Sequence, residues 1–390
     1  MLSILAVIYI VFISLGLPDS LFGVAWPVVH LDFGIAESFA SAYSIITGLC
    51  TGGASFIAGK VLRKFGTPNV TFVSILMTVI GLVGTSFSNN IWVMMVFSVI
   101  LGYGAGAIDT GLNDYVSTHY EARHMNWLHC FWGVGVTASP MIMSLFLKGE
   151  TGSWRVGYRV VAAIQLLIAL IVLFSLKKWK KFDDRSIYAQ SESDGNEKGG
   201  AFAKKGIITS ILSLGFYCSM EFTIGTWGAT YIVNTLALSP DVAAKWVSVY
   251  YGGIMLGRFV AGFVSMKAGD NFMIRCGLSI AVVGFIVLAL PLGTASLLGF
   301  GLIGFGFGPV FPSVLHSVPS RFGTELSADI TGYHMGGAYA VGYAFQLTFG
   351  YVASATTFKI MPYLLLALGA LAITMNETTI SKIKKTEKDG

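Results

Sequence analysis

Three acidic side chains lie inside long apolar stretches of the sequence, where a carboxylate is costly. They are Asp19 in GLPDSLFG, Asp109 in LGYGAGAIDTGLNDYV and Glu221 in SMEFTIG. A charged side chain at the centre of a bilayer costs on the order of 2.5 to 3.5 kcal/mol on insertion scales, so such residues face a protein interior or a watery cavity. Each carboxylate either binds and releases a proton or hydrogen-bonds a neighbouring helix. We favour proton binding for Asp109, and Glu221 and Asp19 are further proton-coupling candidates for which both readings stay open.

His129 is the predicted partner of Asp109. Asp109 lies roughly eight residues before the turn near Ser117, and His129 lies about as far after Glu121. Two residues equally distant from one helix turn occupy a similar depth in a membrane. We expect the two side chains to approach each other, directly or through water, and His129 to alter the proton affinity of Asp109.

The composition predicts that helices carry these residues across a membrane. The 390 residues are 54% hydrophobic and 12% charged, with a mean hydropathy of +0.72, which leaves too few charges to cover a water-facing globule. Apolar runs of about 20 residues recur along the chain, and each is long enough to cross the hydrocarbon core as a helix. Transmembrane barrels show short alternating segments instead. The predicted class is an all-α, multi-pass protein of the inner or plasma membrane.

Twelve membrane spans are expected. Their predicted ranges are 2–29, 38–62, 69–88, 91–115, 122–147, 157–177, 206–235, 241–266, 271–291, 293–316, 325–354 and 358–377. If both termini are cytoplasmic, all but five of the 25 Lys and Arg residues lie on the cytoplasmic side, in keeping with the positive-inside rule. The basic runs adjoin apolar spans, so they do not indicate nucleic-acid binding.

A polar, charged stretch divides the chain into two groups of six spans. The predicted parts are an N-terminal six-helix bundle (1–177), a cytoplasmic linker (178–205), a C-terminal six-helix bundle (206–377) and a cytoplasmic tail (378–390). The halves resemble each other at an offset of about 203 residues: AGKVLRKFG recurs as AGFVSMKAG, and GYGAG recurs as GFGFG. This favours a duplicated six-helix unit. In the fourth span the glycine run indicates close helix packing, while the run in the tenth span, with Pro309 and Pro312, indicates either a bend during the cycle or a passive kink.

Other kinds of site find no support in the sequence. The four cysteines fall inside predicted spans without motif spacing, so neither a disulfide framework nor a metal site is expected. The glycine run before Asp109 follows no strand and is not a nucleotide loop. We expect no cofactor and no enzymatic activity.

Twelve spans in two sixes with a basic central loop resemble the major facilitator superfamily. The loop after the second span, Gly59 to Gly66, is similar to the superfamily's motif there but carries Arg63 where an acid is usual. This departure resembles the fucose-galactose-hexose (FHS) symporter branch. The pattern Gly104-x-Gly106-x-x-Asp109-Thr110-x-x-Asn113 is similar to that branch's G-x-G-x-x-E-T-x-x-N. The branch also relies on an aspartate in the first span, and Asp19 lies about one turn from where it would align.

The resemblance implies a secondary active transporter, most simply a proton-coupled symporter of a hexose or similar small polar sugar. Na⁺ is an alternative coupling ion. An aromatic face packs against the apolar side of a pyranose ring, while amides, imidazoles and carboxylates satisfy its hydroxyls. The candidate substrate-binding residues are Asn113, Trp132, Trp227, Gln346, Tyr333, His334, Trp26 and Gln165, with Trp132 and Trp227 foremost.

Charged residues near the cytoplasmic ends are candidate gating elements. They are Arg63, Lys64, Arg258 and Asp329. A buried arginine needs a partner, and Glu325 or Asp329 is expected to pair with Arg258. We expect a monomer whose partners are the lipid bilayer, a sugar and H⁺. Two alternatives stay open: a proton-coupled exporter of amphipathic compounds, and a substrate sensor that has kept the fold and lost transport.

Overall fold

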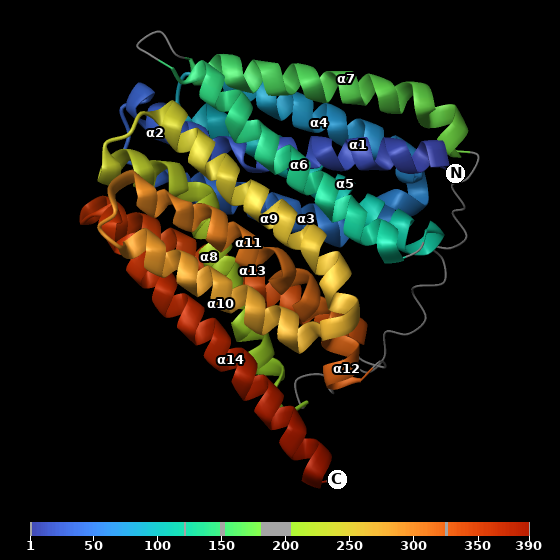
Figure 1. The fold of residues 1–390 in the computed structure, drawn as a ribbon. Helices are drawn as coiled ribbons and strands as arrows, with labels where there is room; N and C mark the ends of the chain where they lie inside the picture. The colour runs from blue at the N-terminus through green and yellow to red at the C-terminus, as the bar shows by residue number, and fades with distance from the viewer. Residues whose placement is uncertain (1, 121, 149–152, 181–203, 324–326, 390) are drawn as a thin grey trace. The chain divides into compact units, whose positions relative to one another are not determined.

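Helices make up nearly all the secondary structure of the described chain (Figure 1). The computed structural model describes every residue except 1, 121, 149–152, 181–203, 324–326 and 390. The α-helices are α1 (Leu2–Asp19), α2 (Leu21–Asp32), α3 (Phe39–Phe65), α4 (Thr67–Phe87), α5 (Ile91–His119), α6 (Ala122–Phe146), α7 (Trp154–Lys180), α8 (Ile207–Leu236), α9 (Pro240–Ala268), α10 (Asp270–Ala289), α11 (Leu298–His316), α12 (Val318–Phe322), α13 (Ser327–Ala355) and α14 (Met361–Asp389). Two 3₁₀ turns, η3 (Gly293–Leu297) and η4 (Phe358–Ile360), precede α11 and α14.

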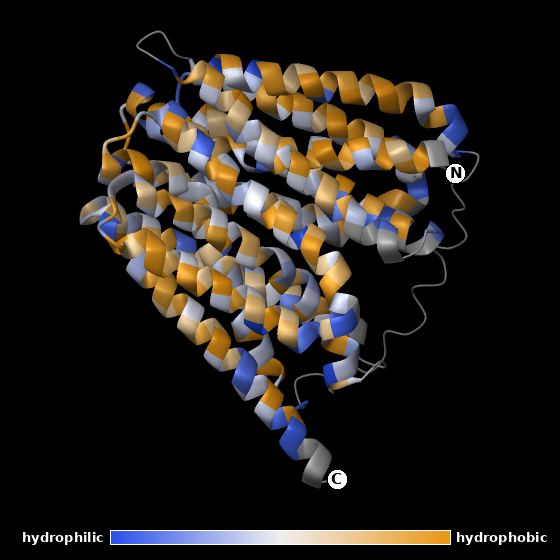
Figure 2. Ribbon diagram, in the orientation of Figure 1, coloured by the Kyte–Doolittle hydropathy of each residue, from blue (hydrophilic) through white to orange (hydrophobic). Residues whose placement is uncertain are grey.

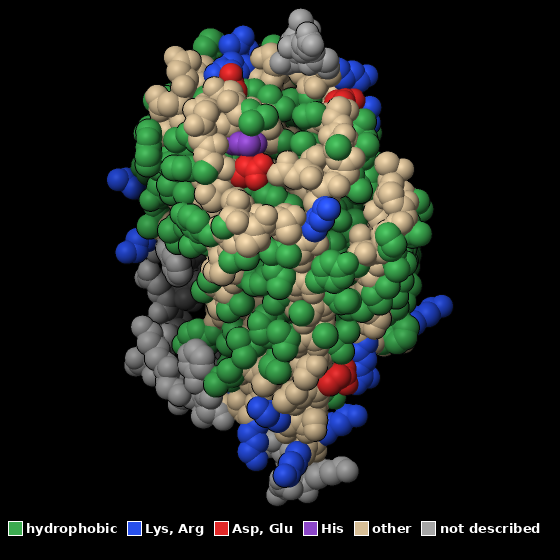
Figure 3. All heavy atoms as spheres, turned by 90° about the vertical axis from the view of Figure 1, so that its left-hand side faces the viewer, with side chains coloured by type: hydrophobic (Ala, Val, Ile, Leu, Met, Phe, Trp, Pro, Cys, Tyr) green, Lys and Arg blue, Asp and Glu red, His purple; other side chains and the backbone are tan. Residues whose placement is uncertain are grey.

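Ten helical stretches of the described residues are long and apolar enough to cross a membrane. α1 and α2 count together as one stretch, while α3 and α13 have the length but are not among the ten. Figure 2 shows hydrophobic residues along most of the helices, and hydrophobic side chains predominate on the face drawn in Figure 3. The all-helical membrane class is therefore confirmed, while the count of twelve spans stays a prediction.

The chain forms two compact units. Unit 1 contains α1 to α7 together with the segment Leu238–Ser248, and unit 2 contains α8, the rest of α9 and α10 to α14. The core of unit 1 includes the fully buried Phe12, Tyr115 and Trp179. The predicted linker lies largely outside the described residues, so its boundaries also stay predictions.

The helices of each unit pair in the same pattern. In unit 1, α1 packs against α6 and α7, and α4 packs against α5 and α7; in unit 2, α8 packs against α13 and α14, and α10 packs against α11 and α14. In chain order, the helices α1, α4, α5, α6 and α7 of unit 1 thus correspond to α8, α10, α11, α13 and α14 of unit 2. Such matching contacts are what duplication of one six-helix bundle would produce.

Glycines let these helices approach closely. A Cβ atom at Gly102 of α5 would lie 2.6 Å from the carbonyl oxygen of Thr47 in α3, and one at Gly104 would lie 2.7 Å from that of Ser74 in α4. Real side chains cannot come so near, so the glycine run serves helix packing as expected.

Three local features differ from the predicted spans. The first span is two helices, because the ring of Pro18 leaves no backbone N–H and the chain turns at Ser20. The short helix α12 was not predicted, since a single turn carries little periodic signal. The expected tail continues α14 as helix to Asp389, because no proline or glycine interrupts residues 378–389.

Candidate functional site

The break between α1 and α2 places Asp19 where its carboxyl group is accessible. The flanking Pro18 and Ser20 are buried, whereas Asp19 is exposed. The Ser20 hydroxyl donates a hydrogen bond of 2.9 Å to the carbonyl of Val136 in α6, which fixes the turn against that helix. An acidic group in the middle of an apolar segment thus stands at an irregular point of the backbone, and at membrane depth such a point must be buried in protein or line a watery cavity.

A close crossing of α1 and α6 brings Trp132 to Asp19. A Cβ atom at Gly135 would lie 3.0 Å from both the Cα of Gly16 and the backbone nitrogen of Leu17, so only glycine permits this approach. One turn before Gly135, the indole Nε1 of Trp132 donates a hydrogen bond of 2.8 Å to Asp19 Oδ2. Trp132, which is predicted to stack on a sugar, is therefore hydrogen-bonded to Asp19, which is predicted to carry a proton.

Asp109 of α5 is the second acidic group of this site. The amide nitrogen of Asn113, one turn later, donates to the Asp109 side-chain Oδ1 at 2.8 Å and to its backbone carbonyl at 2.9 Å. The Asp109 and Asp19 carboxylates repel each other electrostatically. Repulsion between neighbouring carboxylates is relieved when one of them takes up a proton.

Asn113 has an unfilled acceptor beside these acids. Its Oδ1 is buried and receives no hydrogen bond from the described residues. A buried carbonyl oxygen left in this state costs free energy, and a ligand hydroxyl or a water molecule would satisfy it. This atom is the clearest sign of a polar ligand beside Asp109.

His129 lies half-buried on α6, with its ring edge-on to Phe12 of α1 at 5.9 Å between ring centroids. Its pairing with Asp109 stays a prediction. An imidazole contact that the sequence did not suggest lies nearby, where the Tyr9 hydroxyl and His124 Nδ1 are hydrogen-bonded at 2.8 Å.

Glu221, the third acid, lies midway along α8 in unit 2. Tyr217 lies one turn earlier, with its hydroxyl donating to the carbonyl of Phe307 at 3.4 Å, and the Arg258 guanidinium of α9 attracts the Glu221 carboxyl group. The Tyr250 hydroxyl is buried in the same region without a hydrogen-bond partner among the described residues. Glu221 therefore has a cation beside it, unlike the two mutually repelling acids of unit 1.

In unit 1, two predicted substrate residues are core side chains with internal partners. Trp26 is fully buried and donates through Nε1 to the carbonyl of Glu37 at 2.9 Å. Gln165 is fully buried and donates through Nε2 to the carbonyl of Ser14 at 2.5 Å. Neither side chain offers a surface to a ligand in this conformation.

In unit 2, Trp227, Gln346 and His334 are also fully buried. Gln346 Nε2 donates to the Thr226 hydroxyl at 2.8 Å, and His334 Nε2 is hydrogen-bonded to the Ser210 hydroxyl at 2.8 Å. The Nε1 of Trp227 is buried without a hydrogen-bond partner among the described residues. Tyr333 is half-buried against the apolar cluster of Ile207, Val318, Phe322 and Ile330. Their roles in binding substrate stay predictions.

The predicted gating residues are only partly within the described structure. Lys64 is exposed, with its ammonium 5.3 Å from the centroid of the Phe65 ring. The side chains of Arg63 and Asp329, and all of Glu325, lie outside the described residues. The expected ion pair at Arg258 therefore stays a prediction.

Among the described residues, no group of three or more His, Cys, Asp or Glu side chains is placed to hold a metal ion. The chemistry of the site in unit 1 rests on two carboxylates, an indole and an amide. Together they are suited to proton exchange and to hydrogen bonding with a neutral polar molecule.

The Major Facilitator Superfamily model matches residues 8–375, and the chain belongs to that family. The protein is thus a membrane transporter and not an enzyme, as expected from the sequence. With its many membrane-crossing helices it is a multi-pass plasma-membrane protein.

The chain is also similar to individual transport proteins and to solved structures. The chain is 24% identical over 328 residues to the cis,cis-muconate transport protein of Acinetobacter baylyi, covering 80% of this chain and 75% of the relative. It is 23% identical over 281 residues to the glucose/mannose transporter GlcP of Bacillus subtilis, covering 69% and 67%. The fold matches that of a D-xylose-proton symporter with a TM-score of 0.73 at 15% identity, covering 96% of this chain and 97% of the other.

The glycine crossing and the indole bond were not predicted, although the residues that form them are visible in the sequence. Gly16 and Gly135 are glycines in apolar helices, and small residues at such places often mark helix contacts. Which pair of helices meets there is set by the tertiary fold, and a single sequence does not reveal it.

Proposed function

We propose that this transporter is a proton-coupled symporter of a hexose or a similar small polar sugar. The single observation that supports it best is the accessible Asp19 carboxylate, bonded to the indole of Trp132 and repelled by Asp109. Asp109 and Asp19 would exchange the proton. Trp132 would present its ring to the sugar, and Asn113 would accept a sugar hydroxyl.

The movement of one coupled proton supplies enough free energy to concentrate a sugar. Moving one charge through 100 mV supplies about 2.3 kcal/mol, which corresponds to roughly fiftyfold accumulation of a neutral solute. The glucose/mannose relative and the fold shared with a xylose-proton symporter support both the sugar and the proton. We further propose twelve crossings in two six-helix bundles, cytoplasmic termini and a monomeric state.

The experiment is transport by the purified protein in proteoliposomes with an imposed pH gradient. Labelled glucose, galactose, fucose and xylose are offered separately, with Na⁺ present or absent. The expected result is concentrative uptake of at least one sugar that follows the proton gradient without Na⁺. Binding without flux would instead indicate a sensor.

Two further substrates test the other readings. One relative carries the dicarboxylate cis,cis-muconate, so labelled muconate is included. A cationic dye tests export of amphipathic compounds. Gradient-driven transport of either compound, with no sugar flux, would overturn the proposal.

A further inference from the structure

A basic groove lies between α10 and α14 of unit 2. It has a volume of about 450 Å³. Its lining residues are Arg275 from α10 and Glu377, Ile380, Ser381, Lys384 and Lys385 from α14. On a helix, residues three or four apart share a face, so the α14 residues form one continuous wall.

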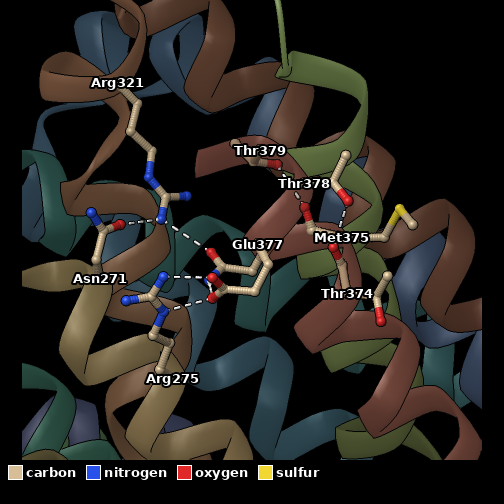
Figure 4. A network of polar contacts seen from close by, with 9 residues as sticks. Asn271, Arg275, Arg321, Thr374, Met375, Glu377, Thr378 and Thr379 are labelled. Atoms are coloured by element: carbon tan, nitrogen blue, oxygen red, sulfur yellow. Dashed lines mark hydrogen bonds and ion pairs between the residues drawn. The ribbon is translucent and has the colours of Figure 1, made fainter. Parts of the chain in front are cut away.

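Arg275 is held in a fixed orientation at this groove. Its Nε donates to Glu377 Oε1 at 2.6 Å and its Nη2 to Oε2 at 2.5 Å, a two-pronged ion pair (Figure 4). The third nitrogen, Nη1, makes no hydrogen bond to a described residue, and the side chain is 51% exposed. An arginine fixed in this way presents its remaining N–H groups to an anion at little entropic cost.

A second guanidinium lies beside this ion pair. Arg321 of α12 donates through Nη2 to Asn271 at 2.7 Å and to Asn376 at 3.1 Å (Figure 4). Burial lowers the pKa of Arg321, but Asp270 and Glu377 act against that shift, and arginine stays charged in proteins. Asp270 and Glu377 thus balance the two guanidinium groups, so the excess positive charge of the groove lining comes from Lys384 and Lys385.

Lys384 and Lys385 contribute exposed cations to the lining of the groove. Neither ammonium group makes an ion pair or hydrogen bond with the described residues. Clusters of lysine and arginine directly beside a membrane span attract anionic lipid headgroups, each contributing about 1 kcal/mol near the surface.

The position of the groove along α14 indicates what kind of anion it would meet. In Figure 2, α14 is mostly hydrophobic and becomes hydrophilic toward its C-terminal end. The groove begins where this change occurs, with Ile380 as an apolar contact. Phe272, one turn from Arg275 on α10, is 52% exposed and can contact an acyl chain. This combination of phosphate-binding cations and an adjoining apolar surface fits a phospholipid better than a soluble anion.

We propose that the groove formed by Arg275, Lys384 and Lys385 binds the phosphate headgroup of an anionic phospholipid. The lipid would occupy the junction of α10 and α14 and add its contacts to the ion pair that joins these helices. This role is independent of sugar or proton transport.

The test is native mass spectrometry of the full chain in detergent, titrated with phosphatidylglycerol or phosphatidylcholine. The groove variant is Lys384→Gln/Lys385→Gln. The matched control is Lys177→Gln/Lys178→Gln, which removes two exposed lysines from the last turn of α7. The apparent affinity of the groove variant for phosphatidylglycerol is expected to fall by about ten- to thirtyfold, with phosphatidylcholine binding unchanged. The control should retain the preference of the natural protein.

Three outcomes would overturn the proposal. An equal loss in both double variants would mean a general surface-charge effect, and no loss in the groove variant would place the anion elsewhere. Displacement of phosphatidylglycerol by an equal concentration of soluble glycerol phosphate would show that the groove recognises free phosphate compounds. Thermal unfolding in phosphatidylcholine verifies that the variants are folded.

Discussion

At the residue scale, Asp19 combines access to solvent with a fixed orientation. The indole of Trp132 holds one carboxylate oxygen, and hydrogen bonds to a charged group contribute about 1.5 to 3 kcal/mol. The other oxygen is left for a proton or for a substrate hydroxyl. Because this hydrogen bond depends on the charge of Asp19, the charge state of Asp19 affects the position of the Trp132 ring. We propose that this ring lies against the sugar.

Removing the charge of Asp109 should uncouple transport from the proton gradient. In the Asp109→Asn variant the side chain no longer titrates, so the roughly fiftyfold accumulation possible at 100 mV should disappear. Exchange of labelled for unlabelled sugar should persist, because it needs no net proton movement. Uptake and counterflow in the same proteoliposomes measure both.

Asp241→Asn is the control for that variant. Asp241 lies at the start of α9, where it is hydrogen-bonded to Ser239 and Lys245 and has no place in the proposed site. It should retain concentrative uptake. Full concentrative uptake by Asp109→Asn would assign coupling to another group, with Glu221 the next candidate.

Two substitutions at Trp132 separate its ring from its N–H group. Trp132→Phe keeps an aromatic face but loses the bond to Asp19, so gradient-driven uptake should fall while the KM for sugar exchange changes by less than about threefold. Trp132→Ala loses the ring as well, and stacking of about 0.5 to 1.5 kcal/mol predicts a KM raised up to about tenfold beyond that of the Phe variant. Equal KM values for the two variants would remove the sugar contact from the proposal.

At this scale the sequence identified the acids and the aromatic residues but not their contacts. Asp19, Asp109 and Trp132 stand out because polar or bulky groups are unusual among small apolar neighbours. The sequence did not show that Trp26, Gln165 and the other buried candidates have internal partners, because a tertiary hydrogen bond leaves no local pattern.

At the scale of helices, the crossing of α1 and α6 positions the site. In Gly135→Ala the added methyl would meet the backbone of Gly16, and overpacking of this kind costs about 1 to 3 kcal/mol. We expect a lower unfolding temperature in detergent together with loss of uptake, because α6 must move away from Asp19.

Gly52→Ala is the matched control for that crossing. An added Cβ at Gly52 in α3 meets no atom within 4 Å, so alanine should leave stability unchanged or raise it by about 1 kcal/mol through its higher helix propensity. A Gly135→Ala protein as stable and active as Gly52→Ala would show that the α1–α6 crossing does not set the site.

Helix existence was predictable because apolar runs of span length have few other solutions in a membrane. The ends of the helices were less predictable. The turn at Ser20 is short and the helical continuation of α14 carries charged residues, so a hydropathy pattern alone places neither.

At the scale of the whole molecule, the distribution of Lys and Arg predicts the topology. Alkaline phosphatase fused after Asp389 should be inactive, because the enzyme needs an oxidising compartment and the C-terminus is expected to be cytoplasmic. A fusion after Lys148, in an expected external loop, should be active. The reverse pattern would invert the predicted orientation.

The matching helix contacts of units 1 and 2 have an evolutionary consequence. The counterpart of α5 is α11, and Gly104-x-Gly106-x-x-Asp109 in the former corresponds in sequence to Gly306-x-Gly308-x-x-Phe311 in the latter. Both copies kept the glycines that their neighbours require, but only one carries an acid three residues on. The packing glycines are thus present in both halves, whereas the acid that we propose carries the proton is present in only one. Under that proposal, the corresponding helix of the other half is free to serve substrate recognition.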